Sequence, residues 1–276
     1  MNWIIRTLTS SVGKKVLMSL TGLFLVTFLI VHMSGNFQLL NPDVLAASES
    51  FNIYAVFMTT FPLIKITSYL LYGSIALHAL VALFLTLQNK KARPTGYAIT
   101  GSAEKSWASR NMGILGSILL AFIIMHMAQF WSRYHFGGEL PVMDIDGYAY
   151  KNLYALVATT FSVWWFSILY LISMLAVGMH LWHGFQSGFQ TLGLQHKKYT
   201  PLISAASKGL AILFIVGFSS MPLAMIAQFG VSNSIDEAAE IVMKKSIEEG
   251  VEWKVSNWSD LEADTEWDKI PATEAE

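Results

Sequence analysis

Histidine is the residue type in this chain whose number and placement point to chemistry. The chain has seven histidines, and five lie within long apolar segments: His32, His78, His126, His180 and His183. Ionisable side chains are rare inside a bilayer, where each must pair, face other helices or bind something. One intramembrane imidazole is readily explained by a hydrogen bond to a neighbouring helix. Five in one chain weaken that interpretation.

The composition is that of a membrane protein. Of the 276 residues, 54% are hydrophobic and 13% are charged, and the mean hydropathy is +0.47. Apolar segments long enough to cross the hydrocarbon core are predicted at 16–38, 63–88, 112–133, 157–186 and 205–229. Each is expected to be a helix, because a lipid-exposed strand would leave backbone groups unpaired. The expected fold is an all-α integral membrane protein, a bundle of five transmembrane helices.

Basic residues in the connections predict the orientation of the spans. Eleven lie on one side, against Lys65, Arg133 and Lys151 on the other: Arg6, Lys14, Lys15, Lys90, Lys91, Arg93, Lys105, Arg110, Lys197, Lys198 and Lys208. Loops rich in lysine and arginine stay in the cytoplasm. The N-terminus is therefore expected to be cytoplasmic and the C-terminus to lie outside.

This orientation sorts the intramembrane histidines by depth. His32 and His126 lie late in two outward-running spans, in the outer leaflet, whereas His78, His180 and His183 lie late in two inward-running spans. Two stacked haem b groups, each held between imidazoles of facing helices, require such pairs. A zinc ion would need three or four ligands at one depth. The pattern therefore predicts two haems, each with two histidine ligands.

Two features of the sequence limit which iron sites the chain can form. His180 and His183 are three residues apart and face similar directions on a helix, so only one of them can ligate the inner iron. Cysteine is absent. This excludes iron–sulfur ligation, thiolate-ligated haem and c-type haem attachment within the polypeptide.

Four segments resemble the cytochrome b membrane subunit of succinate dehydrogenase and fumarate reductase, in its single-chain, five-helix, two-haem form. The resemblance covers about residues 10–229, and its most specific segment is the last. The segments are HMSGN from His32, LHAL from Leu77, SRNMG from Ser109 with the later His126-Met127, and HLWHGFQSGFQTLG from His180.

In that family, one histidine from each of the first four helices ligates haem. The ligands that the resemblance implies are His32 and His126 for the outer haem and His78 and His183 for the inner haem, with His180 as the alternative to His183. His183 is preferred because Gly184 follows it directly and Gly188 comes four residues after Gly184, as the family's pattern is taken to require.

The resemblance also implies partners that carry what this chain lacks. A flavoprotein subunit with FAD and an iron–sulfur subunit with its clusters are expected on the cytoplasmic side of a bacterial inner membrane. Electrons from succinate would pass to quinone, with menaquinone as the acceptor for this two-haem form. The chain would carry out no dicarboxylate chemistry itself, and its other contacts would be lipid, with no nucleic acid.

A quinone site near the outer haem needs a proton carrier, and carboxylates suit that role. Glu49, in the loop expected after the first span, is the candidate, in competition with Asp43, Glu139, Asp144 and Asp146. The haem propionates are expected to meet cationic donors from among Arg110, Arg133 and Lys151.

Two alternative functions remain open at this point. The first is the haem b subunit of another respiratory oxidoreductase, such as a formate dehydrogenase or a hydrogenase. The second is a transporter or structural scaffold that uses its histidines for packing or proton relay. A transporter would be expected to show broken helices or repeat symmetry.

The C-terminal segment differs from the rest of the chain. Residues 1–229 form the predicted transmembrane cytochrome domain, whereas residues 230–276 hold 13 of the 19 acidic residues. Acidic residues ahead of basic ones at helical spacing predict a helix between Ser232 and about Gly250. The whole segment is expected to be a solvated extension outside the membrane, with about its last twenty residues poorly ordered.

Overall fold

Five helical segments are long and apolar enough to cross a membrane, which confirms the predicted count within the part of the chain that the structure describes. The structure is a computed structural model, and it describes residues 3, 6, 9–92, 107–136, 139–251 and 253–257. The spans are Ser11–Leu40, Pro62–Ala92, Met112–Phe136, Trp164–Thr191 and Thr200–Phe229. By length and composition the chain is a multi-pass membrane protein.

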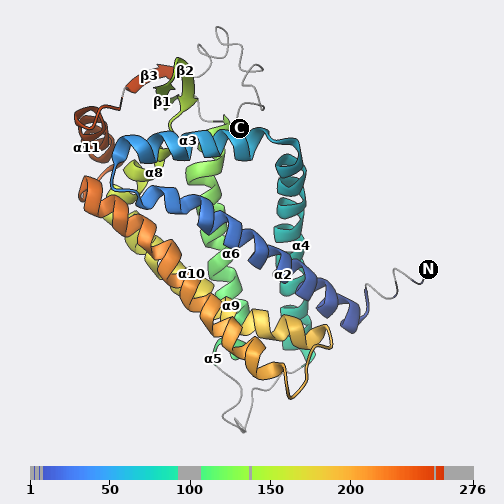
Figure 1. The fold of residues 1–276 in the computed structure, drawn as a ribbon. Coiled ribbons are helices and arrows are strands. Elements are labelled where there is room, and N and C mark those ends of the chain that lie inside the picture. The colour runs from blue at the N-terminus through green and yellow to red at the C-terminus, as the bar shows by residue number, and fades with distance from the viewer. Residues whose placement is uncertain are drawn as a thin grey trace. The chain divides into compact units, whose positions relative to one another are not determined.

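Some spans comprise more than one helical element (Figure 1). The elements are α2 (Ser11–Asn36) with the 3-10 turn η1 (Phe37–Leu40), α4 (Pro62–Ala92), α6 (Met112–His126) with the π-helix η2 (Met127–Trp131) and α7 (Ser132–Phe136), α9 (Trp164–Thr191) and α10 (Thr200–Phe229). Two shorter helices, α3 (Val44–Thr60) and α5 (Trp107–Arg110), lie in the connections on either side of α4.

The chain divides into two compact units, and the boundaries fall within the five long helical spans. Unit 1 comprises Met1–His32, Ser68–Phe122 and Ile172–Phe218, and unit 2 comprises Met33–Thr67, Ile123–Leu171 and Ser219–Glu276. Each unit has its own contacts, which are described separately below.

Small residues mark the places where helices of unit 1 approach one another. A methyl group added at Gly178 of α9 would overlap Ile215 of α10, and one at Gly113 of α6 would lie 3.3 Å from Thr86 of α4. Glycine permits such close approach because membrane helices associate through packing rather than through the hydrophobic effect. The histidine-bearing helices of this unit are therefore held at short, specific distances.

The helices α4 and α6 bury few of their own side chains. Leu71 is the buried residue of α4, and Leu115 is the buried residue of α6. In a soluble protein such apolar helices would be unstable, but in a bilayer their uncovered faces can contact lipid or a bound apolar group. Protein packing alone therefore does not cover these two helices.

The fourth predicted span, 157–186, is wrong at its start. α8 (Leu153–Ser162) ends at Val163, which is extended with φ −77° and ψ 113°, and α9 begins at the next residue. The backbone N–H of Ser232 donates to the Ser162 carbonyl at 2.8 Å. The chain after α10 thus pairs with the break between the two helices. Hydropathy does not detect this break, because the sequence is apolar on both sides of it.

Unit 2 also contains a small antiparallel sheet that the all-α prediction lacked. Its strands are β1 (Glu139–Ile145), β2 (Tyr148–Lys151) and β3 (Trp253–Asn257), in the order β2-β1-β3. Asp146 and Gly147 form the hairpin turn with φ of 56° and 83°. An Asp-Gly pair of this kind is a strong hairpin signal, and it was present in the sequence.

The described part of the segment after residue 230, residues 231–251 and 253–257, belongs to unit 2, and its helix packs there rather than forming a solvated extension. The helix expected between Ser232 and Gly250 is α11 (Ile235–Glu248), capped by the Ser234 side chain, which accepts from the Glu237 N–H at 3.2 Å. α11 packs against α8 (Figure 1) and buries Ala238, Val242 and Ser246. β3 then joins the sheet. Residues 258–276, which were expected to be poorly ordered, lie outside the described residues.

A buried pair of asparagines joins α3 to the start of α8. The Asn52 amide nitrogen donates to Asn152 Oδ1 at 3.1 Å, and Asn52 Oδ1 accepts from the Tyr154 N–H at 3.1 Å. Asn152 Oδ1 also accepts from the Ala155 N–H at 2.9 Å, as the N-cap of α8. Both asparagines are completely buried, so these bonds determine how the two helices pack.

We expect Asn52→Ala to lower the free energy of unfolding by about 1–3 kcal/mol, because the buried Tyr154 N–H loses its acceptor. Thermal unfolding of the full chain in detergent measures the change. Ser50→Ala is the matched control, since Ser50 lies on the exposed face of the same helix and its hydroxyl donates to the Ala46 and Ala47 backbone carbonyls one turn earlier. Equal stability of the two variants would contradict the prediction.

Candidate cofactor-binding site

Within unit 1, the helices α4 and α9 bring the rings of His78 and His180 close together. The ring centroids are 6.4 Å apart, and the ring planes are inclined by 65°. Two imidazoles bonded at about 2 Å to opposite sides of one metal ion have centroids about 6 Å apart. At the observed spacing, both imidazoles could hold the same iron.

A hydrogen bond fixes the protonation pattern of the His78 ring. Thr21 Oγ1 of α2 lies 3.0 Å from His78 Nδ1. The Thr21 hydroxyl donates its own hydrogen to the Leu17 carbonyl at 2.8 Å, so its oxygen accepts from Nδ1–H. The proton is then on Nδ1, and Nε2 keeps the lone pair that a metal ligand needs. Metal-bound histidines are commonly oriented in this way.

Glycines of neighbouring helices lie beside both rings. A Cβ atom at Gly22 of α2 would be 3.3 Å from His78 Cε1, and one at Gly116 of α6 would be 3.8 Å from His180 Cε1. A longer side chain at Gly22 would press on the His78 ring. The two positions therefore keep the edges of the imidazoles clear of protein side chains.

The His180 ring has a buried nitrogen whose hydrogen bonding is not satisfied by the chain. His180 Nδ1 has no hydrogen-bond partner within the described ranges. A buried polar atom without a partner costs free energy, so such atoms in native structures call for an explanation. The ring spacing fits a haem held between the two imidazoles, and His180 Nδ1 would then still need an acceptor from the bound group, because iron would be held at Nε2.

The geometry favours His180 over His183 as the partner of His78. His183 lies on a similar face of α9 but about 4.5 Å further along the helix axis, and the ring contact that the structure gives to His78 comes from His180. His183 is half-buried near the end of α9. The preference for His183 used the glycine spacing of a motif, which contains no information on distance. Because the ring contact to His78 comes from His180, the alternative named from the sequence is the ligand that we propose below, and the ligand assignment stays a prediction.

The two histidines of the expected outer pair lie in different units. His32, in unit 1, packs against Phe28 and Phe218 with ring centroids 5.3 Å and 5.8 Å away. His126, in unit 2, is the last residue of α6, directly before the π-helix η2. π-helical turns are rare and occur often at functional sites. The pairing of His32 with His126 as ligands of one haem stays a prediction.

His126 is the first member of a hydrogen-bonded chain in unit 2. Its Nδ1 lies 3.3 Å from the Tyr170 hydroxyl of α9, and that hydroxyl donates to Gln129 Oε1 at 2.7 Å. Nothing in the sequence pattern distinguishes Tyr170 or Thr21 from other polar residues of the spans. Both were missed for this reason.

The candidate proton carrier Glu49 lies in a helix rather than in the expected loop. It is half-buried in α3. Two of its competitors have local structural roles: Asp43 caps α3 by accepting from the Ala46 N–H at 3.0 Å, and Asp144 accepts from the Gly147 N–H at 2.9 Å. Asp146 is exposed in the hairpin turn, and the Glu139 side chain lies outside the described part.

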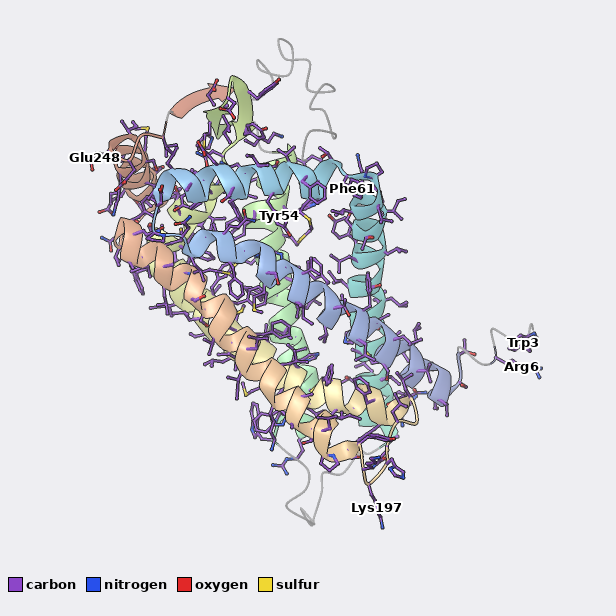
Figure 2. All side chains as sticks on the ribbon, viewed as in Figure 1. Trp3, Arg6, Tyr54, Phe61, Lys197 and Glu248 are labelled. Carbon is purple, nitrogen blue, oxygen red and sulfur yellow. The ribbon has the colours of Figure 1, made fainter. Side chains whose placement is uncertain are left out.

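Tyr54 is a further polar residue that sequence analysis missed. It projects from α3, on the same helix as Glu49 and near the labelled Phe61 at its end (Figure 2). A Cβ atom added at Gly35 of α2 would overlap the Tyr54 ring. Burial raises the pKa of Tyr54 above its ordinary value, so the phenol stays protonated and can donate a hydrogen bond.

The three cations expected to meet haem propionates have different surroundings. Lys151 Nζ donates to the Tyr134 carbonyl at 3.0 Å and lies 5.3 Å from the centroid of the Tyr134 ring. Arg110, in α5, and Arg133, in α7, are exposed. Lys151 therefore has a structural role in unit 2.

Comparisons of the chain with protein-family models, with curated proteins and with solved structures find no match. Among the residues that the structure describes, no group of three or more His, Cys, Asp or Glu is placed to hold a metal ion. A haem needs only two axial ligands from protein, so this result does not bear on the His78–His180 pair.

Cysteine cross-linking can test the ring pairing without any assumption about a cofactor. The chain has no cysteine of its own. We expect His78→Cys with His180→Cys to be joined by a short bifunctional thiol reagent several-fold faster than His78→Cys with His183→Cys. Proteolysis at a site inserted between residues 92 and 107 then leaves the two fragments joined on a non-reducing gel. Equal or reversed rates would contradict the observed pairing.

Proposed function

We propose that the chain is the diheme cytochrome b membrane subunit of a succinate:quinone oxidoreductase, a succinate dehydrogenase or fumarate reductase. The observation that carries the proposal is the 6.4 Å separation of the His78 and His180 rings on two membrane-spanning helices. Packing alone seldom places two imidazoles opposite each other in a bilayer, because each ring must then satisfy its nitrogens.

The remaining histidines complete the proposed ligand set. His78 and His180 would hold the inner haem, and His32 and His126 the outer one. Haem b, when bound, supplies a one-electron redox centre. The chain's own part is to hold the iron between imidazoles, to keep water away and to fix the tautomer of each ligand.

The absence of cysteine supports a division of labour among subunits. The chain cannot hold an iron–sulfur cluster, so electrons would reach it from an iron–sulfur subunit and a flavoprotein with FAD on the cytoplasmic side of a bacterial inner membrane. Quinone, most simply menaquinone, would react on the outer side. Half-buried Glu49, on α3 with Tyr54, is the proposed proton carrier there.

Cofactor and partner analysis of the affinity-purified chain tests this proposal. We expect two haem b per chain by pyridine haemochrome assay, and co-purification of a covalent flavoprotein and an iron–sulfur protein. A molybdenum or nickel protein instead would favour a formate dehydrogenase or a hydrogenase. Folded protein without haem, made with ample haem supply, would overturn the proposal and leave proton relay or packing as the role of the histidines.

Single substitutions test the ligand assignment. We expect His78→Ala and His180→Ala to remove the same spectral component, and His32→Ala and His126→Ala to remove the other. His183→Ala is the matched control on α9 and should keep both components. Redox difference spectra of membranes measure each component. Loss of one component in His183→Ala with retention in His180→Ala would return the assignment to His183.

A further inference from the structure

Two of the proposed ligands have a hydroxyl group at the same ring nitrogen. His78 Nδ1 lies 3.0 Å from Thr21 Oγ1 in unit 1, and His126 Nδ1 lies 3.3 Å from Tyr170 Oη in unit 2. Each hydroxyl comes from a different helix than its histidine. The same contact thus recurs in two separately packed parts of the chain.

The hydrogen of each hydroxyl is used elsewhere, so each oxygen is an acceptor for its histidine. Thr21 donates to the Leu17 carbonyl at 2.8 Å, and Tyr170 donates to Gln129 Oε1 at 2.7 Å. A hydroxyl has one hydrogen to donate. With the hydroxyl hydrogens assigned in this way, Nδ1 of His78 and His126 carries the proton and Nε2 keeps the lone pair in both rings.

The Tyr170 hydroxyl makes its hydrogen bonds within a buried cluster of aromatic side chains. Tyr170 is buried, and its ring packs edge-on against Phe161 and Phe130 with centroids 4.9 Å and 6.2 Å away. Phe130 also contacts the His126 ring at 5.3 Å. The π-helix η2 contributes both Gln129 and Phe130 to this cluster, so the widened turn builds the partners of Tyr170.

We propose that Thr21 and Tyr170 are positioning residues for His78 and His126, fixing the Nδ1–H tautomer and the ring orientation, and thereby tuning the reduction potentials of two haems independently. The inference rests on the proposed function. Hydrogen bonding at Nδ1 makes the imidazole a stronger donor to iron. An imidazole that donates more electron density stabilises the oxidised, more positive iron. Each hydroxyl therefore lowers the reduction potential of the haem that its histidine would hold.

The isosteric variants Tyr170→Phe and Thr21→Val remove the hydroxyls with little change in volume. We expect Tyr170→Phe to change the oxidised-to-reduced ratio of the His126-dependent component by about three- to tenfold toward reduction at fixed ambient potential, as expected for one hydrogen bond. Thr21→Val should do the same for the His78-dependent component only. Potentiometric titration of the purified complex, followed in the haem bands, measures both.

Two controls separate positioning from general destabilisation. Tyr154→Phe removes another buried tyrosine hydroxyl of unit 2, which donates to Gln228 Oε1 at 3.0 Å and contacts no histidine in the described structure. It should leave both potentials unchanged. Thr21→Ser keeps a hydroxyl and should restore the behaviour of the parent chain.

The outcomes distinguish this inference from the proposed function. A parent chain without haem overturns the proposed function. Two haems whose potentials are unchanged in both variants, or which shift together, overturn the positioning role and leave the function intact, and so does an equal shift in Tyr154→Phe. Loss of the His126-dependent haem alone in Tyr170→Phe, with both haems kept in Tyr154→Phe, supports the positioning role.

Discussion

An imidazole within a membrane-spanning helix needs a partner for its polar nitrogens. In this chain, neighbouring helices supply such partners to His78 and His126. Water is absent from the hydrocarbon core, so partners must come from the protein or from a bound group. Thr21 serves His78 and Tyr170 serves His126, each through Nδ1. His180 Nδ1 has no such partner within the described chain. The glycines beside these rings and the sparse packing of α4 and α6 leave these faces available to a bound group.

Polar groups also need partners at the helix ends of unit 2, where they belong to the backbone rather than to histidine side chains. Its helices α3, α8 and α11 are short, and their ends must satisfy backbone groups that a continuous span would pair internally. The Asn52–Asn152 pair, the Ser234 cap and the pairing of Ser232 with the break at Val163 do this. These contacts are local and polar, in contrast with the glycine contacts of unit 1. The segment after α10 is therefore required to complete the unit.

Sequence analysis predicted those features that depend on average composition over many residues. Five apolar windows identified the five spans, and the acidic-to-basic spacing identified α11. The break at Val163 could not be predicted, because it depends on a backbone pairing with Ser232, far along the chain. The choice of His180 over His183 likewise depends on where α9 faces α4, and the motif carries no such information. The Asp146-Gly147 hairpin signal was present and was overlooked beside the stronger hydropathy pattern.

The surroundings of His78 and His126, the two proposed ligands with a hydroxyl at Nδ1, differ from each other. Thr21 donates its hydrogen to a backbone carbonyl of its own helix, so the hydrogen-bonded contact to His78 Nδ1 comes from α2. Tyr170 passes its hydrogen to Gln129, in the π-helical turn directly after His126. His126, Tyr170 and Gln129 are thus linked by hydrogen bonds between α9 and the segment around η2, whereas the Thr21 contact to His78 comes from a regular α-helix. If both histidines hold haem as proposed, the two haems can have different potentials, because the hydrogen-bond partners of their ligands differ.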